Sequence, residues 1–258
     1  MCRLAAYFGP EITLDHFLNE PTHGLVQQSW APREMREAKL NADGFGFGWV
    51  MRDGRRGRYV NPMPIWTDVN LASLGPALSS PLWLGNVRSA TYATSVGHAN
   101  TMPFVDDELI FMHNGFLGRF AEDVRSRMRS RLEPRFESCI NGTTDSEYVF
   151  ALLRQLTAGA AGGLVEAVRE LLAILDEDLS GTHALLNLAV TDGSRLVAVR
   201  HAVDRSCPTL YVSAAEPRFP GAALLASEPL TDHVSWTPVS EHSMVVVEDG
   251  ADIRHEAL

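Results

Sequence analysis

The sequence begins Met1-Cys2-Arg3-Leu4-Ala5-Ala6-Tyr7, with a cysteine directly behind the initiator methionine and an apolar segment after it. Because cysteine is small, removal of Met1 would leave Cys2 with a free α-amine, whose ordinary pKa of about 7.7 to 8.0 lies near neutral pH. That amine can serve as the base for the thiol, so one residue would supply both nucleophile and base. Cysteine also occurs at position 2 by chance, so this prediction depends on the rest of the chain.

The composition is that of an ordinary globular protein. The 258 residues are 45% hydrophobic and 21% charged, with a net charge of -10, and they predict one domain over 2–258 with a large core. The acidic balance argues against a nucleic-acid partner, because phosphate binding needs clustered Lys and Arg. No stretch approaches the roughly 18 apolar residues of a membrane span, and the N-terminus lacks the features of a secretory signal. We therefore expect a cytoplasmic protein without a membrane partner.

The cysteines and histidines have no spacing typical of metal sites. Cys2, Cys139 and Cys207 are an odd number without a Cys-x-x-Cys pair, so neither a disulfide framework nor a zinc site is predicted. The histidines lack the helical or hairpin spacing that brings metal ligands together, as in His16, His23, His98, His113 and His183. The sequence therefore predicts no metal and no cofactor.

The hydrophobic patterns predict strands on both sides of a helical region. In the first half we expect a strand over 3–8 ended by Gly9-Pro10, a brief helix over 14–18, a surface loop over 25–36, strands over 47–51 and 58–60, a helix over 70–79, and strands over 82–88 and 109–112. Then come helices over 120–132, 148–156 and 164–175, and strands over 183–191, 195–200, 210–213, 224–227 and 244–248. This order indicates a pair of antiparallel sheets with helices outside.

Glycines alternate with aromatic residues in Asn41-Ala42-Asp43-Gly44-Phe45-Gly46-Phe47-Gly48-Trp49-Val50. A dinucleotide-binding loop would have to follow a strand and open a helix, and this stretch itself resembles a strand. The glycines predict a close backbone approach or a bulge. The stretch is either a strand packed within a sheet or a strand that lines a substrate pocket.

Polar residues follow two of the predicted strands. Arg88 ends the strand over 82–88, where it could bind a carboxylate through paired hydrogen bonds or form a structural ion pair. The strand over 109–112 runs into His113-Asn114-Gly115. An Asn-Gly pair often forms a turn, but it also offers the amide and backbone N–H donors of an oxyanion hole.

Thr144-Asp145-Ser146-Glu147 precedes the helix predicted over 148–156. Thr144 and Glu147 fit a capping box, which would place Asp145 in the first helical turn. There its carboxylate would stabilise the helix dipole, or it would bind substrate if it faced a pocket.

In their order, these motifs resemble those of the class II glutamine amidotransferases, which are N-terminal-nucleophile hydrolases. The resemblance rests on Cys2, Asn41-Ala42-Asp43-Gly44, Val87-Arg88-Ser89-Ala90-Thr91, His113-Asn114-Gly115 and Thr144-Asp145-Ser146-Glu147, and it extends to at least Glu228. It implies an α+β fold, the four-layer αββα sandwich of two antiparallel sheets. Met1-Cys2-Arg3 and Ala226-Ser227-Glu228-Pro229 are most similar to the stand-alone branch, which includes the γ-glutamyl hydrolase of ergothioneine biosynthesis.

The resemblance implies a role for each matching residue. Cys2 would be the nucleophile with its α-amine as base, and Asn114 and Gly115 would form the oxyanion hole. Arg88 would bind the α-carboxylate of a γ-glutamyl group and Asp145 its α-ammonium. The other residues expected at the substrate are Thr91, Asp43, Gly44 and His113. Phe45 stands where many relatives have tryptophan, and Phe47 to Trp49 is bulkier than expected, which leaves the leaving-group side of the pocket undefined.

The function implied is hydrolysis of a small γ-glutamyl amide with release of glutamate, without a cofactor. The expected substrate is γ-glutamyl-hercynylcysteine sulfoxide. The alternatives are a glutaminase subunit that supplies ammonia to a separate synthase, a hydrolase of glutathione-like γ-glutamyl thiols, and an inactive scaffold relative. The leaving amine and the formation of a homo-oligomer stay open.

Overall fold

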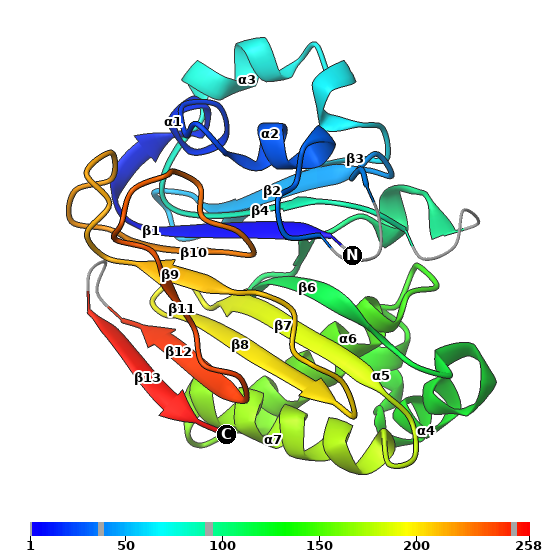
Figure 1. Ribbon diagram of the computed structural model, residues 1–258. Helices are drawn as coiled ribbons and strands as arrows, with labels where there is room; N and C mark the ends of the chain where they lie inside the picture. Colours follow the sequence, from blue (N-terminus) through cyan, green and yellow to red (C-terminus); the bar gives the residue numbers. More distant parts are fainter. Residues whose placement is uncertain (1, 36–38, 91–94, 249–251) are drawn as a thin grey trace.

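The computed structural model of the protein describes residues 2–35, 39–90, 95–248 and 252–258. Within these residues the strands form two antiparallel sheets that lie face to face (Figure 1). The first sheet has the order β11 (Thr237–Pro238), β9 (Tyr211–Ser213), β10 (Ala223–Ala226), β1 (Arg3–Thr13), β4 (Ser79–Val87), β2 (Phe45–Val50), β3 (Arg56–Asn61). The second has the order β13 (Ile253–Ala257), β12 (Ser243–Val247), β8 (Leu196–Val203), β7 (Ala184–Thr191), β6 (Ile110–Leu117), β5 (Phe104–Val105).

Helices cover the outer faces of both sheets (Figure 1). The first sheet is covered by α1 (Leu14–Leu18), α2 (Leu25–Trp30) and α3 (Leu71–Ala77). The second is covered by α4 (Arg125–Arg131), α5 (Pro134–Glu137), α6 (Asp145–Gly159) and α7 (Gly163–Asp178). Single turns occur at η1 (Ile65–Thr67) and η3 (His98–Asn100), and a π-helix, η4 (Phe120–Val124), leads into α4. None of the described helices is long and apolar enough to cross a membrane.

Three layers of apolar side chains hold these elements together. Between the sheets, aliphatic residues such as Leu4, Leu84 and Ile110 pack face to face. Aromatic residues such as Trp83 pack under α1 to α3, and leucines such as Leu171 pack under the second sheet. Because apolar surface removed from water stabilises folding by roughly 25 cal/mol per Å², both faces of each sheet contribute. The predicted αββα sandwich is confirmed.

Strand β1 lies in the middle of the first sheet, paired with β10 and β4. Its residues alternate between layers, with Leu4 facing the other sheet and Tyr7 facing the helices. The predicted end of this strand at Gly9-Pro10 is wrong, because a register shift between Phe8 and Ile12 lets the strand pass the proline and continue to Thr13. Cys2 therefore directly precedes a strand that is paired on both sides.

The glycines of β2 allow the two sheets to approach closely. A Cβ atom on Gly46 would lie 2.4 Å from the carbonyl oxygen of Met102, and one on Gly48 would lie 2.7 Å from Cγ2 of Ile110. The neighbouring aromatic residue Phe47 faces the helical layer. Of the two interpretations of this stretch, the packed strand is the one that the structure supports.

One loop expected from the sequence, and one of the alternatives for Asn114-Gly115, are regular structure instead. Residues Leu25–Trp30 form α2, while 36–38 of the predicted loop lie outside the described residues. The Asn114-Gly115 pair does not form a turn, because β6 continues to Leu117 and pairs with β7 throughout. Continuous pairing with a neighbouring strand outweighs the local turn preference of Asn-Gly.

The start of α6 differs from the predicted capping box. The side chain of Thr144 makes no capping hydrogen bond. Glu147 instead accepts the backbone N–H groups of Asn141 and Gly142, through Oε1 at 2.7 Å and Oε2 at 2.6 Å. Glu147 therefore holds the segment before the helix and not the cap itself.

Candidate active site

A cavity of about 510 Å³ lies where β1 begins and β4 ends. Predicted site residues from separate segments line it together, namely Cys2, Arg88, His113, Gly115 and Asp145. Asn114 is fully buried, and neither it nor Asp43 and Gly44 belong to the lining. Thr91 lies outside the described residues. The fold thus brings a thiol, a cation and a carboxylate to one cavity.

Cys2 is held from its main-chain side. Its side chain is buried, and Sγ lies 3.8 Å from the carbonyl oxygen of Ser89. The Nε–H of Arg3 donates to the carbonyl oxygen of Cys2 at 2.7 Å. Nη1 of Arg3 in turn forms an ion pair with Oε1 of Glu228 at 2.9 Å, and both side chains are inaccessible to solvent. The buried ion pair with Glu228 therefore fixes Arg3, and Arg3 fixes the carbonyl group of Cys2.

Glu228 is the centre of this buried network. Besides Arg3 it contacts Nε2 of His23 at 2.9 Å and accepts the backbone N–H groups of Arg33 and Glu34 at 2.7 and 3.0 Å. Burial by itself raises the pKa of Glu228, but the hydrogen bonds from these donors and the charge of Arg3 hold it at about 2. Burial lowers the pKa of Arg3. One feature of the sequence indicates this role, because Arg3 lies at the start of an apolar strand and a buried cation needs a buried anion.

Arg88 follows β4 directly, and its side chain is buried at the cavity. Nη2 donates to Oγ of Ser95 at 3.0 Å, and Nη1 donates to the carbonyl oxygen of Asp43 at 3.4 Å. Among the described residues no carboxylate pairs with this guanidinium. Within the described residues, Arg88 therefore does not form the structural ion pair that was its alternative role.

Asp43 and Gly44 hold the segment that carries Arg88. The Arg88 N–H donates to the carbonyl oxygen of Gly44 at 2.8 Å, and the Asp43 N–H donates to the carbonyl oxygen of Arg88 at 3.0 Å. The carboxylate of Asp43 also accepts the backbone N–H of Ala90 at 2.8 Å. These hydrogen bonds join Asp43 and Gly44 to the segment of Arg88 and Ala90.

Asn114 and Gly115 lie in the closely packed part of β6. Nδ2 of Asn114 donates to Oγ of Ser227 at 3.2 Å, while its Oδ1 is buried without a hydrogen-bond partner in the described structure. The same Ser227 hydroxyl accepts the N–H of Leu4 at 3.0 Å. A Cβ atom at Gly115 would lie 1.7 Å from the carbonyl oxygen of Leu185, so only glycine fits there.

Asp145 begins α6, and backbone N–H groups hold both oxygens of its carboxylate. Oδ2 accepts the N–H of Leu117 at 2.7 Å, and Oδ1 accepts the N–H of Ser146 at 2.7 Å. His113 lies behind it, with Nδ1 2.9 Å from Oγ of Ser146 and Nε2 2.9 Å from the carbonyl oxygen of Leu185. Both nitrogens of His113 thus have protein partners, so this histidine orients the start of α6.

The comparison with known families fits this geometry. The profile of the class-II glutamine amidotransferases matches residues 20–217. The chain belongs to this family. The chain is 31% identical, over 96% of both chains, to a protein of Mycolicibacterium smegmatis named gamma-glutamyl-hercynylcysteine sulfoxide hydrolase. It is 27% identical to the probable glutamine amidotransferase DUG3 of Saccharomyces cerevisiae, over 100% of this chain and 85% of that protein.

Solved structures show the same fold for this amidotransferase. A glutamine aminotransferase class-II domain protein from Silicibacter pomeroyi superposes with a TM-score of 0.69 and 26% identity, over 100% of both chains. The glutamine phosphoribosylpyrophosphate amidotransferase from B. subtilis superposes with a TM-score of 0.67 and 16% identity, over 99% of this chain and 49% of that chain. The second likeness concerns the fold alone.

Part of the wall of the larger cavity was not predicted. Phe116, Arg119, Phe120 and Glu122 line it from the end of β6 and the start of η4. Phe116 also packs edge-on against His183, with ring centroids 5.5 Å apart. A strand end followed at once by mixed aromatic and charged residues was the available signal for this wall.

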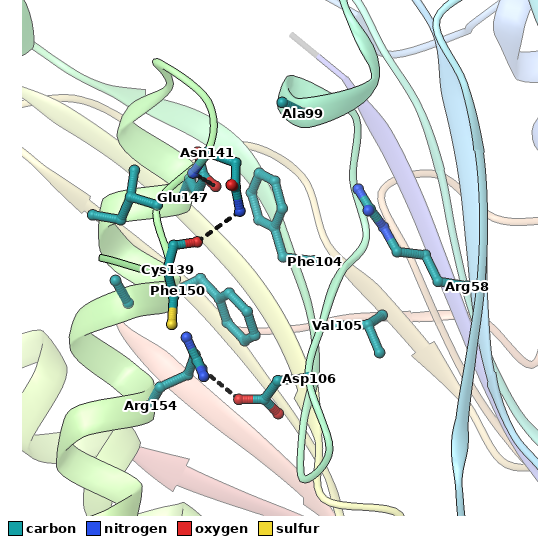
Figure 2. Close-up of a pocket in the computed structure, with 12 residues that line it drawn as sticks. Arg58, Ala99, Phe104, Val105, Asp106, Cys139, Asn141, Glu147, Phe150 and Arg154 are labelled. Atoms are coloured by element: carbon teal, nitrogen blue, oxygen red, sulfur yellow. Dashed lines mark hydrogen bonds and ion pairs between the residues drawn. The ribbon is translucent and has the colours of Figure 1, made fainter. Parts of the chain in front are cut away.

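A second, smaller cavity of about 240 Å³ lies beside α6 (Figure 2). Its charged groups are already matched, because Arg154 pairs with Asp106 and Arg58 donates to the carbonyl oxygens of Pro103 and Thr101. Burial raises the pKa of Glu147, which also lines this cavity. None of the predicted site residues belongs to this cavity's lining.

Proposed function

We propose that this chain hydrolyses a γ-glutamyl amide with Cys2 as nucleophile, and that the substrate is γ-glutamyl-hercynylcysteine sulfoxide. The observation that carries the proposal is the single cavity lined by Cys2, Arg88 and Asp145. A guanidinium and a carboxylate suit the α-carboxylate and α-ammonium of a γ-glutamyl group. The name of the mycobacterial relative supports the choice of leaving group.

The reaction proceeds through a thioester. The α-amine of Cys2, exposed by removal of Met1, takes the thiol proton, and the thiolate attacks the γ-carbonyl carbon. The oxyanion is bound by the N–H of Gly115 and the amide of Asn114. The carbon–nitrogen bond then breaks, and the leaving amine takes the proton from the α-ammonium. The α-amine of Cys2 then deprotonates a water molecule, which attacks the thioester. Glutamate is released and the Cys2 thiol is restored.

The oxyanion role of Asn114 requires its Nδ2 to be available. Nδ2 is bonded to Ser227, and Oδ1 is buried without a partner. Rotation of the amide by half a turn exchanges the positions of Nδ2 and Oδ1. The Ser227 hydroxyl, which accepts from Nδ2 in one orientation, can donate to Oδ1 in the other. The rotated amide satisfies Oδ1 and frees Nδ2. We infer that the active enzyme uses this orientation.

Asn114→Ala tests the assignment through glutamate release from γ-glutamyl-hercynylcysteine sulfoxide. Loss of one oxyanion donor is expected to lower kcat about 100- to 1000-fold, with the thermal unfolding curve showing that the protein still folds. Asn70→Ala, at the start of α3 and outside the cavity, is the matched control. A kcat within a few-fold of the wild type for Asn114→Ala would refute the oxyanion role.

A second candidate is a glutaminase subunit that passes ammonia to a separate synthase. The similarity to the yeast protein named probable glutamine amidotransferase favours it. Glutamine, glutathione and the hercynylcysteine sulfoxide conjugate are therefore compared as substrates of the same preparation. The highest kcat/KM for the conjugate supports the first proposal, and glutamine turnover stimulated by an added synthase supports the second.

A further inference from the structure

Three side chains with metal-ligating atoms come together outside the lining of the larger cavity. Sγ of Cys207, a carboxylate oxygen of Glu241 and a ring nitrogen of His242 all lie within 4.8 Å of one another. Cys207 is in the connection between β8 and β9, and the other two directly precede β12. Because Ser243 of β12 lies opposite Arg200 of β8, sheet pairing brings these two segments together.

We propose that Cys207, Glu241 and His242 bind a Zn²⁺ ion, with water at the fourth position. Thiolate, imidazole and carboxylate are the ligands that Zn²⁺ takes in proteins. Bond lengths of about 2.0 to 2.3 Å and tetrahedral angles place ligand atoms about 3.4 to 3.6 Å apart. The three ligand atoms lie within 4.8 Å of one another, so binding an ion would draw them closer together. Three protein ligands with one open position are a known zinc arrangement.

A hydrogen-bond chain orients the imidazole of His242. Nε2 of His201 lies 3.0 Å from Oδ1 of Asp176, and Nδ1 of His201 lies 2.9 Å from Nδ1 of His242. Since a carboxylate accepts, His201 carries its proton on Nε2, and its Nδ1 accepts the Nδ1 proton of His242. Nε2 of His242 then has the free lone pair that a metal ligand needs. Carboxylate–histidine pairs commonly orient zinc ligands in this way.

The backbone at His242 and an ion pair of Glu241 also distinguish this group of residues. His242 has a φ of 53°, in the left-handed region that non-glycine residues rarely adopt. Arg200 pairs with Glu241 at 3.5 Å. Zinc would displace the thiol proton and hold the thiolate.

The alternative is that Cys207 serves only as a small apolar side chain. It packs in a cluster with Leu185 and Ala202, against Phe116 of the cavity wall. Packing alone accounts for its burial, but it does not require Glu241 and His242 at the sulfur. Metal binding separates the two interpretations, because a cysteine that serves only in packing would not hold zinc together with Glu241 and His242.

The test uses the full chain with Cys2→Ser and Cys139→Ser, so that Cys207 is the remaining thiol. After dialysis against Zn²⁺, one retained zinc per chain is expected. Co²⁺ is expected to give the near-ultraviolet charge-transfer absorption of a thiolate–cobalt bond. Adding Cys207→Ser is expected to abolish that absorption, and His242→Ala, at an exposed position, to weaken zinc retention strongly. His255→Ala, at another exposed histidine, is the matched control and should change neither.

A separate variant tests the hydrogen bonds from Asp176 through His201 to His242. Asp176→Asn is expected to weaken zinc binding about 10- to 100-fold, as for other outer-sphere partners of zinc ligands. If the starting protein retains no zinc, or if its cobalt spectrum is unchanged by Cys207→Ser and His242→Ala, the proposed site is overturned.

Discussion

The buried pair of Arg3 and Glu228 offers a quantitative test of how the nucleophile is held. Glu228→Gln keeps the volume of the side chain but removes the charge that compensates Arg3. Both side chains are inaccessible, and Glu228 also serves two backbone N–H groups and His23. Removing one member of a buried pair typically costs about 3 to 5 kcal/mol of folding free energy. We expect a loss in this range, together with a lower kcat because Arg3 no longer holds the Cys2 carbonyl.

The pKa of Glu228 gives an independent estimate of the same size. It lies at about 2 in the folded protein against an ordinary value of 4.5. Since each tenfold change in proton affinity is worth about 1.4 kcal/mol, the ionised carboxylate contributes on the order of 3 kcal/mol. A lowered folded pKa means that this stabilisation is present above pH 4.5 and is lost as the pH falls toward 2. The difference between wild type and Glu228→Gln should therefore shrink by about 2 kcal/mol between pH 6 and pH 3.

Urea unfolding followed by tryptophan fluorescence measures both effects. The matched control is Asp232→Asn, which removes an exposed partner of Arg33 and should cost less than about 1 kcal/mol. Arg3→Met added to Glu228→Gln removes the unpaired cation and should recover part of the loss. The reasoning is refuted if Glu228→Gln costs no more than the control, or if the double variant is as unstable as the single one.

Two further substitutions probe the cavity itself. Gly115→Ala should lower the free energy of unfolding by about 1 to 3 kcal/mol or more, because its Cβ would overlap the carbonyl oxygen of Leu185. Gly159→Ala at the end of α6, where a Cβ meets nothing within 4 Å, should not lower it, and urea unfolding measures both variants. Ser95→Ala removes the hydroxyl that orients Arg88, so KM for the γ-glutamyl substrate should rise about tenfold with kcat nearly unchanged. An unchanged KM would show that Ser95 does not position Arg88.

Much of the fold follows from local patterns. The helix over 14–18, the hairpin of β2 and β3, and the long helices α6 and α7 were predicted because their apolar residues repeat with the period of their element. The strands β5 and β11 were missed because two residues carry no periodicity. Strand β13 was missed because its side chains are mostly exposed, so its apolar content is low.

The order of motifs was enough to predict the family, the sandwich, and the residues of the thiol, cation and carboxylate that line one cavity. It was not enough to predict what holds them. Arg3 and Glu228 are 225 residues apart, and nothing local relates them until β1 and β10 pair.

The tertiary structure alone decided the partners of polar groups that are distant in the chain. Asp43 and Gly44 face the backbone of Arg88, and Cys207 lies beside Glu241 and His242 despite a spacing that suggests no metal site. The physical reason is that apolar periodicity fixes which face of an element is buried. Strand pairing and sheet packing then fix which distant side chains meet, and buried polar groups must find their hydrogen-bond partners among those neighbours.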